Sequence, residues 1–476
     1  MKKFKNIFLL VAAVAFTFTS CETIDFGDTN VDRNSPSEAS TASLLTNAQR
    51  TVSGYIASTT SNCYVQYLSN GQYPEESQYQ TLNWSPDGYY AALVDLDRIV
   101  RLNSDEATKV AAQANGSNNN QIAAATILRV YFLHGMTDRW GMLPYTEALQ
   151  GLENQYPAYD TQEAIYTGLF AELDIALTMI DNGNGPSGDI LFRGDMDMWR
   201  TFANTIKLTM ALRLSNADPA KGRAKFNEAW SGAISSNSEN LKYTYLLEDT
   251  NDNPWQDRFE TRRDYMVSDV LVNHMIGSGD STNPEDPRLP KYAEPAFNSG
   301  TFVGAFYGTD NSATDDYSFI THDIIYKGDA PLYIYTYAEV LFARAEAAYL
   351  GWTSEDPSAL YEDAIAASME QWGVSSTDAA AYIAANPYSA VNDIAYEKWV
   401  AMYLQGYNSW HEWRRQKAMG YEVPLTPPEE MLSNATGIPQ RHAYSATAPA
   451  LNEENYNAAI AAQGTDDLNT ILWINQ

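Results

Sequence analysis

Apolar residues recur at helical spacing along most of this chain. From residue 41 onward, and again after residue 120, they return every three or four positions, as in helices that bury one face. The pattern predicts one helical stretch over 41–67 and then four consecutive helix pairs. The pairs are 120–137 with 162–180, 196–214 with 221–235, 337–350 with 357–372, and 377–385 with 391–417.

The third pair shows the pattern most clearly. Tyr337, Val340 and Leu341 fall on one helical face. Asp356 and Pro357 then supply an N-cap and a first-turn proline for the second helix. Short antiparallel pairs of this size resemble tetratricopeptide-type hairpins, which stack because one hairpin cannot bury its own face. We therefore predict a mainly all-α fold of stacked tetratricopeptide-like helical hairpins.

Residues 238–335 interrupt the helical pattern with prolines, glycines and scattered aromatic residues. A long irregular segment inside a compact domain is usually functional or disordered, and the aromatic residues favour order. We predict that this irregular, loop-rich insert is ordered and functional. Residues 421–476 are also rich in loops, and the length of the chain leaves one large domain or two fused lobes open.

The N-terminus has the pattern of an export signal. Three lysines precede an apolar run over 7–18, which is too short to span the ~30 Å core of a bilayer. Cys21 follows Thr19 and Ser20 at the expected cleavage point, as in a bacterial lipobox, with Phe18 where leucine is commoner. We predict a signal peptide over 1–20, acylation of Cys21, and a polar tether over 21–40. A lipoprotein cysteine carries several acyl chains, and stable anchoring takes more than one.

The net charge of the chain limits the classes of partner that it can bind. Sixty acidic residues against 30 basic ones give a net charge of −30, which repels nucleic acid and anionic lipid headgroups alike. Membrane attachment must therefore come from the lipid on Cys21. Cys63 is the other cysteine, and we interpret it as a buried, inert thiol and not a catalytic one.

Motifs for catalysis or cofactors are lacking in the sequence. It contains no GxSxG, HExxH, GxxxxGK[ST] or dinucleotide-binding motif, and its five histidines lie far apart. Residues 249–260 place oxygen-bearing side chains at the spacing of an EF-hand loop, but Pro254 stands where that loop needs glycine. We interpret this segment as a turn and helix cap, and we predict neither an enzyme nor a cofactor.

Aromatic residues are the stronger signal for binding. A stripe over 391–417 that includes Trp399, Trp410 and Trp413 fits one buried helix face and is predicted to be core. Aromatic rings in loops can instead stack on sugar faces or hold a peptide. Our candidate ligand contacts are Tyr73, Tyr79, Trp84, Trp255 and Tyr307.

Short motifs follow one another along nearly the whole chain. They are NVDRNSP at 30–36, TDRWG at 137–141 with PY at 144–145, FAN at 202–204 with Arg213, DPRLP at 286–290, AEA at 345–347, EKW at 397–399 with WHEWRR at 410–415, and PQR at 439–441 with NEENY at 452–456. In this order they resemble the SusD/RagB family of Bacteroidetes surface lipoproteins, and within it the SusD-like subgroup. Arg33 and Ser445 stand where the family usually has proline.

This resemblance implies a single domain over 41–476 with four tetratricopeptide-like hairpins, in which the irregular, loop-rich insert over 238–335 carries the ligand site. It implies a nutrient-binding lipoprotein of the outer membrane that captures oligosaccharide or oligopeptide at the cell surface. It also implies a partner, a SusC-like TonB-dependent transporter that the protein covers as a lid. Some members bind calcium, and the signature motifs look structural.

Two alternatives stay open at this stage. One is a surface glycoside hydrolase or peptidase on a helical scaffold, which predicts paired carboxylates or a metal cluster in a cleft. The other is a scaffold that docks protein partners, which predicts an exposed apolar groove.

Overall fold

The computed structural model describes residues 39–82, 84–278 and 284–476. Residues 40–476 form one compact unit, which is the part described below. Cys21, the signal segment and the tether lie outside the described residues. Among the described residues, no helix combines the length and the apolarity that crossing a bilayer requires.

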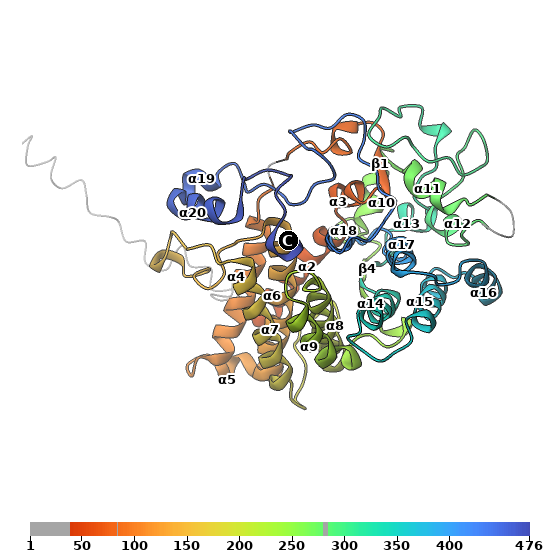
Figure 1. Cartoon of the computed structure of the whole chain (residues 1–476). Helices are drawn as coiled ribbons and strands as arrows, with labels where there is room; N and C mark the ends of the chain where they lie inside the picture. Colours follow the sequence, from red (N-terminus) through yellow and green to blue (C-terminus); the bar gives the residue numbers. More distant parts are fainter. Residues whose placement is uncertain (1–38, 83, 279–283) are drawn as a thin grey trace, which may run out of the picture. The chain divides into compact units, whose positions relative to one another are not determined.

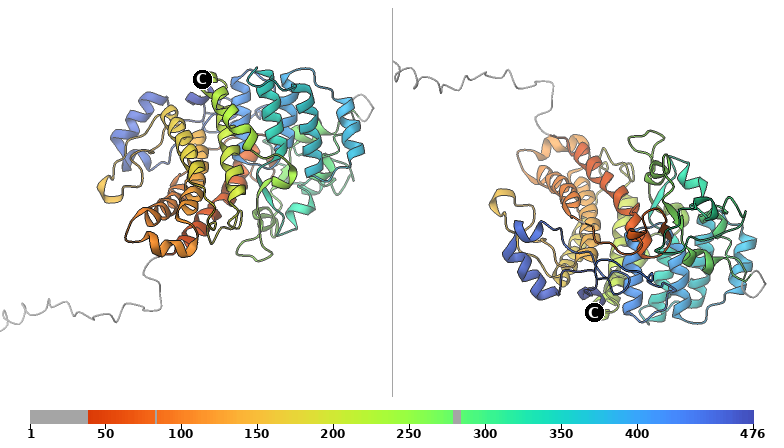
Figure 2. Two further views of the ribbon diagram at one scale, coloured as in Figure 1. Left: turned by 90° about the horizontal axis from the view of Figure 1, so that it is seen from below. Right: turned by 90° about the horizontal axis from the view of Figure 1, so that it is seen from above.

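Helices dominate this unit, as the sequence predicts, and most of them stand side by side (Figures 1 and 2). The longer helices are α2 (Thr41–Ile56), α4 (Asp87–Ser104), α6 (Asn118–Trp140), α7 (Gln162–Met179), α8 (Met196–Arg213), α9 (Pro219–Ala229), α14 (Tyr337–Tyr349), α15 (Pro357–Gln371), α16 (Ser376–Ala385), α17 (Val391–Ala401), α18 (Tyr407–Ala418) and α20 (Glu453–Gln463). The shorter helices are α3 (Thr59–Tyr64), α5 (Lys109–Ala112), α10 (Pro254–Phe259), α11 (Asp269–Met275), α12 (Leu289–Tyr292), α13 (His322–Ile325) and α19 (Ala448–Leu451).

Three of the four predicted pairs pack as hairpins, namely α6 with α7, α8 with α9, and α14 with α15. In the fourth, α16 packs on α15 and α17 packs on α14. The structure also contains a helix pair that was not predicted. Helix α2 packs on α4, and α4 packs on α6. Local signals support these helices: Thr336 and Glu339 form a capping box at the start of α14, and the Asp356 side chain caps α15.

The stretch predicted as one helix over 391–417 is broken. It forms α17 and α18, because Leu404 and Gly406 adopt positive φ angles of 61° and 58°. A Cβ on Gly406 would lie 2.7 Å from the carbonyl oxygen of Ile56, so only glycine fits this turn. The core prediction for the stripe is confirmed, since Trp399 and Trp410 are both buried.

The irregular region contains short strands among its loops. β1 (Leu68–Asn70) pairs antiparallel with β3 (Tyr265–Val267), and Ser69 stands opposite Met266. β2 (Leu241–Tyr243) pairs antiparallel with β4 (Leu332–Tyr335). Through the first pairing, the segment after α3 joins the irregular region 238–335 at the upper right of Figure 1.

Candidate ligand-binding face

Three segments that are distant in sequence meet beside the β1–β3 pair. The Gly71 N–H donates to the Asp264 carbonyl at 2.9 Å, and the Asn311 N–H donates to the Gly71 carbonyl at 2.9 Å. The Asn311 side chain also donates to the Phe306 carbonyl at 2.8 Å. Backbone hydrogen bonds therefore fix residues 70–73, 262–264 and 306–317 next to one another.

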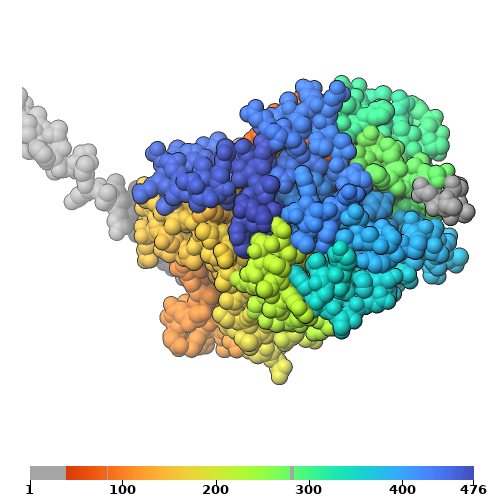
Figure 3. Space-filling model, in the orientation of Figure 1, coloured from red at the N-terminus to blue at the C-terminus, as the bar shows by residue number. Residues whose placement is uncertain are grey.

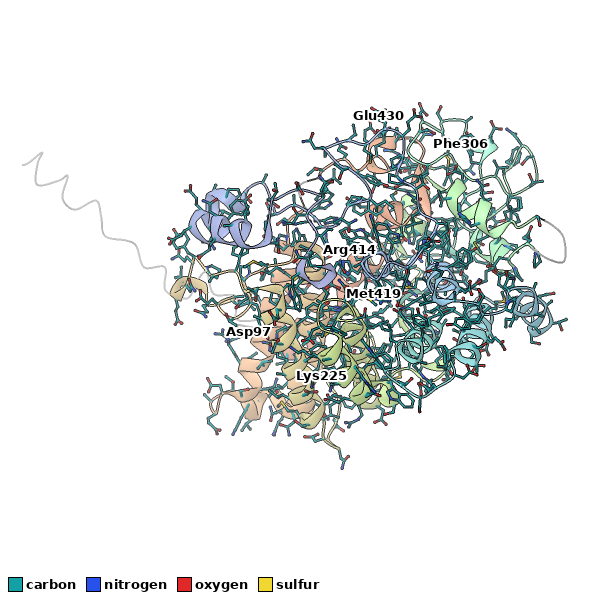
Figure 4. The ribbon with its side chains drawn as sticks, viewed as in Figure 1. Asp97, Lys225, Phe306, Arg414, Met419 and Glu430 are labelled. Carbon is teal, nitrogen blue, oxygen red and sulfur yellow. The ribbon has the colours of Figure 1, made fainter. Side chains whose placement is uncertain are left out.

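Exposed aromatic rings gather on these three segments. Tyr73 is 52% exposed and Phe306 is 61% exposed, and Phe306 stands at the upper edge of the ribbon in Figure 4. The half-buried Tyr317 ring meets the edge of Phe306 at 6.4 Å between centroids. The guanidinium of Arg262 lies 4.8 Å from the centre of the Tyr73 ring. We call Tyr73, Arg262, Phe306 and Tyr317 the aromatic face.

Polar groups accompany these rings. Arg262 and Asp264 pair at 2.8 Å, and Arg263 and Asp315 pair at 3.1 Å, with all four side chains on the same three segments. The Asn311 Oδ1 atom is buried and has no hydrogen-bond partner among the described residues. Flat rings beside fixed donors and acceptors can stack on a sugar ring and hydrogen-bond its hydroxyls.

Four of the five rings that we predicted as ligand contacts are buried. Tyr79 and Trp255 are wholly inaccessible, while Trp84 and Tyr307 are each 8% exposed. Only Tyr73 among the five lies on the aromatic face.

Protein groups cover the faces of these buried rings. Trp84 stacks on the imidazole of His442 at 4.0 Å, and the Tyr307 hydroxyl donates to the Cys63 carbonyl at 2.6 Å. Tyr79 contacts the edge of Tyr64. A ring packed in this way has no free face for a ligand, so we restrict the predicted stacking contacts to Tyr73 and add Phe306 and Tyr317.

The sequence-based candidates did not include Arg262, Phe306 or Tyr317. For Arg262, the available signal was a pair of adjacent arginines, 262 and 263, within the irregular region of an acidic chain. Their proximity to Tyr73 arises from the strand pairing, which the sequence does not show.

The other chemical candidates are structural. Cys63 is buried, and burial raises the pKa of its thiol well above the usual range. In the EF-hand-like segment, the Asn253 side chain caps α10 by accepting from the Trp255 N–H at 2.8 Å. Among the described residues, no cluster of three or more His, Cys, Asp and Glu side chains is arranged to hold a metal ion.

The comparisons with known proteins agree with this architecture. Residues 33–445 match a family model called SusD-like, whose description is "Starch-binding associating with outer membrane". The chain belongs to this SusD-like family. No match was found among curated protein sequences.

Solved structures share the SusD-like fold. A SusD homologue from Bacteroides fragilis has a TM-score of 0.79 at 24% identity, covering 92% of this chain and all of that one. A chitin-binding SusD homologue from Flavobacterium johnsoniae has a TM-score of 0.76 at 22% identity, covering 92% of this chain and 98% of that one. A chitin-binding protein has a TM-score of 0.77 at 24% identity, covering 91% and 99%. At these identities the likeness shows the fold.

Proposed function

We propose that this SusD-like protein is a non-enzymatic, lipid-anchored nutrient-binding protein of the cell surface, which captures oligosaccharides at its aromatic face. The observation that carries the proposal is the exposure of Tyr73 and Phe306 beside fixed polar groups, in a family described as starch-binding. Chitin-binding relatives of the same fold support a glycan over a peptide.

The proposal includes delivery of the captured glycan to a SusC-like TonB-dependent transporter in the outer membrane. The family description, which places its members in association with the outer membrane, supports this partner. A hollow of about 540 Å³ between α14, α15 and α16 supports a role in docking. Leu341, Val374, Ile383 and several alanines line it beside Asp363 and Glu370, and this mixture of apolar and charged side chains suits a protein segment.

Calorimetric titration with chito- and malto-oligosaccharides tests glycan capture. Replacing a stacked ring by alanine should cost about 1–3 kcal/mol of binding free energy, by analogy with stacked bases. We expect that loss for Tyr73→Ala and for Phe306→Ala. Tyr349→Ala is the matched control, because this ring is 50% exposed but ends α14, away from the aromatic face.

The same titrations separate the alternatives. If Tyr73→Ala and Phe306→Ala bind the oligosaccharides as tightly as the wild type and the Tyr349→Ala control do, the aromatic face is not the glycan site. If the oligosaccharides are shortened during the titration, the hydrolase alternative gains over simple capture.

A further inference from the structure

A separate pocket of about 310 Å³ opens beside the end of α18. Its walls come from α18, from residues 436–440 and from residues 469–475 near the C-terminus. Figure 3 shows the chain end, in the darkest blue, lying next to the blue segments that precede it. No residue of the aromatic face lines this pocket.

The charge of the pocket is opposite to that of the chain. Arg414 and Lys417 line it, and none of the described residues in its wall is aspartate or glutamate. The whole chain, by contrast, has twice as many acidic as basic residues. Two cations without a carboxylate in a confined space create a local positive potential that attracts an anion.

Arg414 is a buried cation that forms no ion pair among the described residues, although the nearby Asp138 carboxylate acts on it and partly offsets the effect of burial on its pKa. Its Nη2 donates to the Asp138 carbonyl at 2.5 Å, its Nη1 donates to the Gln440 carbonyl, and its guanidinium lies 4.1 Å from the centre of the Trp410 ring. Burial lowers the pKa of Arg414 to about 9. Carbonyl oxygens and a ring solvate this charge only partly, so an anion nearby would stabilise it.

Several residues of the pocket wall have hydrogen-bond donors without an acceptor among the described residues. Asn475 is 8% exposed, and its side-chain amide has no hydrogen bond within the described chain. The backbone N–H groups of Gly437 and Ile438 likewise have no acceptor among the described residues. Lys417 forms no ion pair there, and its ammonium lies 5.2 Å from the Trp413 ring centre.

We propose that this pocket binds the carboxylate group of an acidic ligand. A carboxylate is small, accepts several hydrogen bonds, and would be held by Lys417 and the Asn475 amide in the field of Arg414. The volume lies at the small end for ligand sites, so it fits one sugar ring or one terminal residue of a peptide. Two sources carry this group: a uronic acid and the C-terminus of a peptide.

Calorimetry with four probes tests the site and distinguishes the sources. The sugar pair is trigalacturonate and the neutral maltotriose, and the peptide pair is N-acetyl-dialanine and its C-terminal amide. We expect trigalacturonate to bind more tightly than maltotriose in the Tyr73→Ala variant, where the aromatic face is weakened, and the peptide acid to bind more tightly than its amide. The affinity of each acidic probe should fall as salt is added. Binding of trigalacturonate alone identifies an acidic sugar, and binding of the free peptide acid alone identifies a peptide terminus.

Two variants and a control locate the binding. Lys417→Gln should weaken binding of the acidic probe about tenfold to a hundredfold, as loss of one charge-assisted hydrogen bond predicts. Asn475→Asp should weaken binding of the acidic probe at least as much, because the new aspartate would repel the carboxylate of the probe. Lys242→Gln, on the exposed side of β2, removes the same charge elsewhere and should leave affinity unchanged.

Thermal unfolding of each variant checks that the fold is intact, and Lys417 is exposed enough for its replacement to be tolerated. The proposal is overturned if neither acidic probe binds, or if Lys417→Gln binds them as well as Lys242→Gln does. Loss of maltotriose binding in Tyr73→Ala, with trigalacturonate binding retained, would show that the two sites are separate.

Discussion

At the scale of residues, the sequence motifs meet in a buried ion network. Arg415 donates to Glu346 at 2.5 Å and to Glu412 at 2.6 Å, and Glu412 also accepts from Lys398 at 2.6 Å. These side chains come from α14, α17 and α18, and all are buried. Removing one partner of such a pair leaves an uncompensated buried charge. The AEA, EKW and WHEWRR motifs therefore hold α14, α17 and α18 together.

Glu339, next to this network, makes stability depend on pH. Burial raises the pKa of its carboxyl from 4.5 to about 7. Because the folded-state value is the higher one, the stabilisation is complete below pH 4.5 and is lost as pH rises through 7. The shift corresponds to roughly 3 kcal/mol of unfolding free energy.

Glu339→Gln should remove this dependence while keeping an acceptor for the Thr336 N–H, which now lies 2.9 Å from the carboxylate. Urea unfolding of both proteins at several pH values measures the difference in their unfolding free energies. We expect the variant to gain stability relative to the wild type between pH 4.5 and 7. A difference that stays constant over this range would contradict the assignment.

The sequence located aromatic residues but not their exposure. Trp84 and Tyr307 lie in loop-like sequence, yet each finds a partner from a remote segment, His442 and Cys63. Burial of a loop residue depends on which distant segments cover it, and a single sequence does not show this.

At the scale of elements, the regular hairpins could be predicted and the breaks could not. The predicted 162–180 and 357–372 match α7 and α15 within one residue at each end. Helix α4 was missed because Pro86, Gly88 and the neighbouring tyrosines resemble a loop, although Leu93 and Leu96 lie buried on one face. The α17–α18 break was missed because apolar residues continue through it without interruption.

Gly406 should be required for the turn that separates α17 from α18. Gly406→Ala forces a Cβ into a positive φ and against the Ile56 carbonyl oxygen, so we expect it to cost about 2 kcal/mol or more. Gly420 has a φ of 75° but open space around its Cα. Gly420→Ala therefore isolates the conformational cost, about 1 kcal/mol. Urea unfolding measures both losses, and equal losses would show that the contact with Ile56 is unimportant.

At the scale of the whole molecule, the aromatic face is a product of the fold. Its residues come from segments near 73, 262 and 306, which β1–β3 pairing and the Gly71–Asn311 hydrogen bond join. The sequence predicted an irregular binding region over 238–335, and part of the face lies there. Tyr73 reaches the aromatic face because β1 pairs with β3, a strand almost 200 residues further along the chain.

The proposed anchor gives the last prediction. If Cys21 is acylated, the lipid holds the protein beside its transporter and raises its effective concentration there without any new contact. The aromatic face belongs to the unit 40–476, so its affinity for glycan should not depend on the lipid. Cys21→Ala should therefore bind oligosaccharide as the wild type does in calorimetry, yet abolish glycan-dependent growth in cells.

Cys63→Ala is the matched control for a change of cysteine, because this thiol is buried in the folded unit and carries no lipid. Fractionation of the cells shows whether each variant reaches the membrane. Normal growth of the Cys21→Ala strain, with the protein released from the membrane, would mean that capture works without tethering. The binding face would then act alone, and the transporter would find the loaded protein by diffusion.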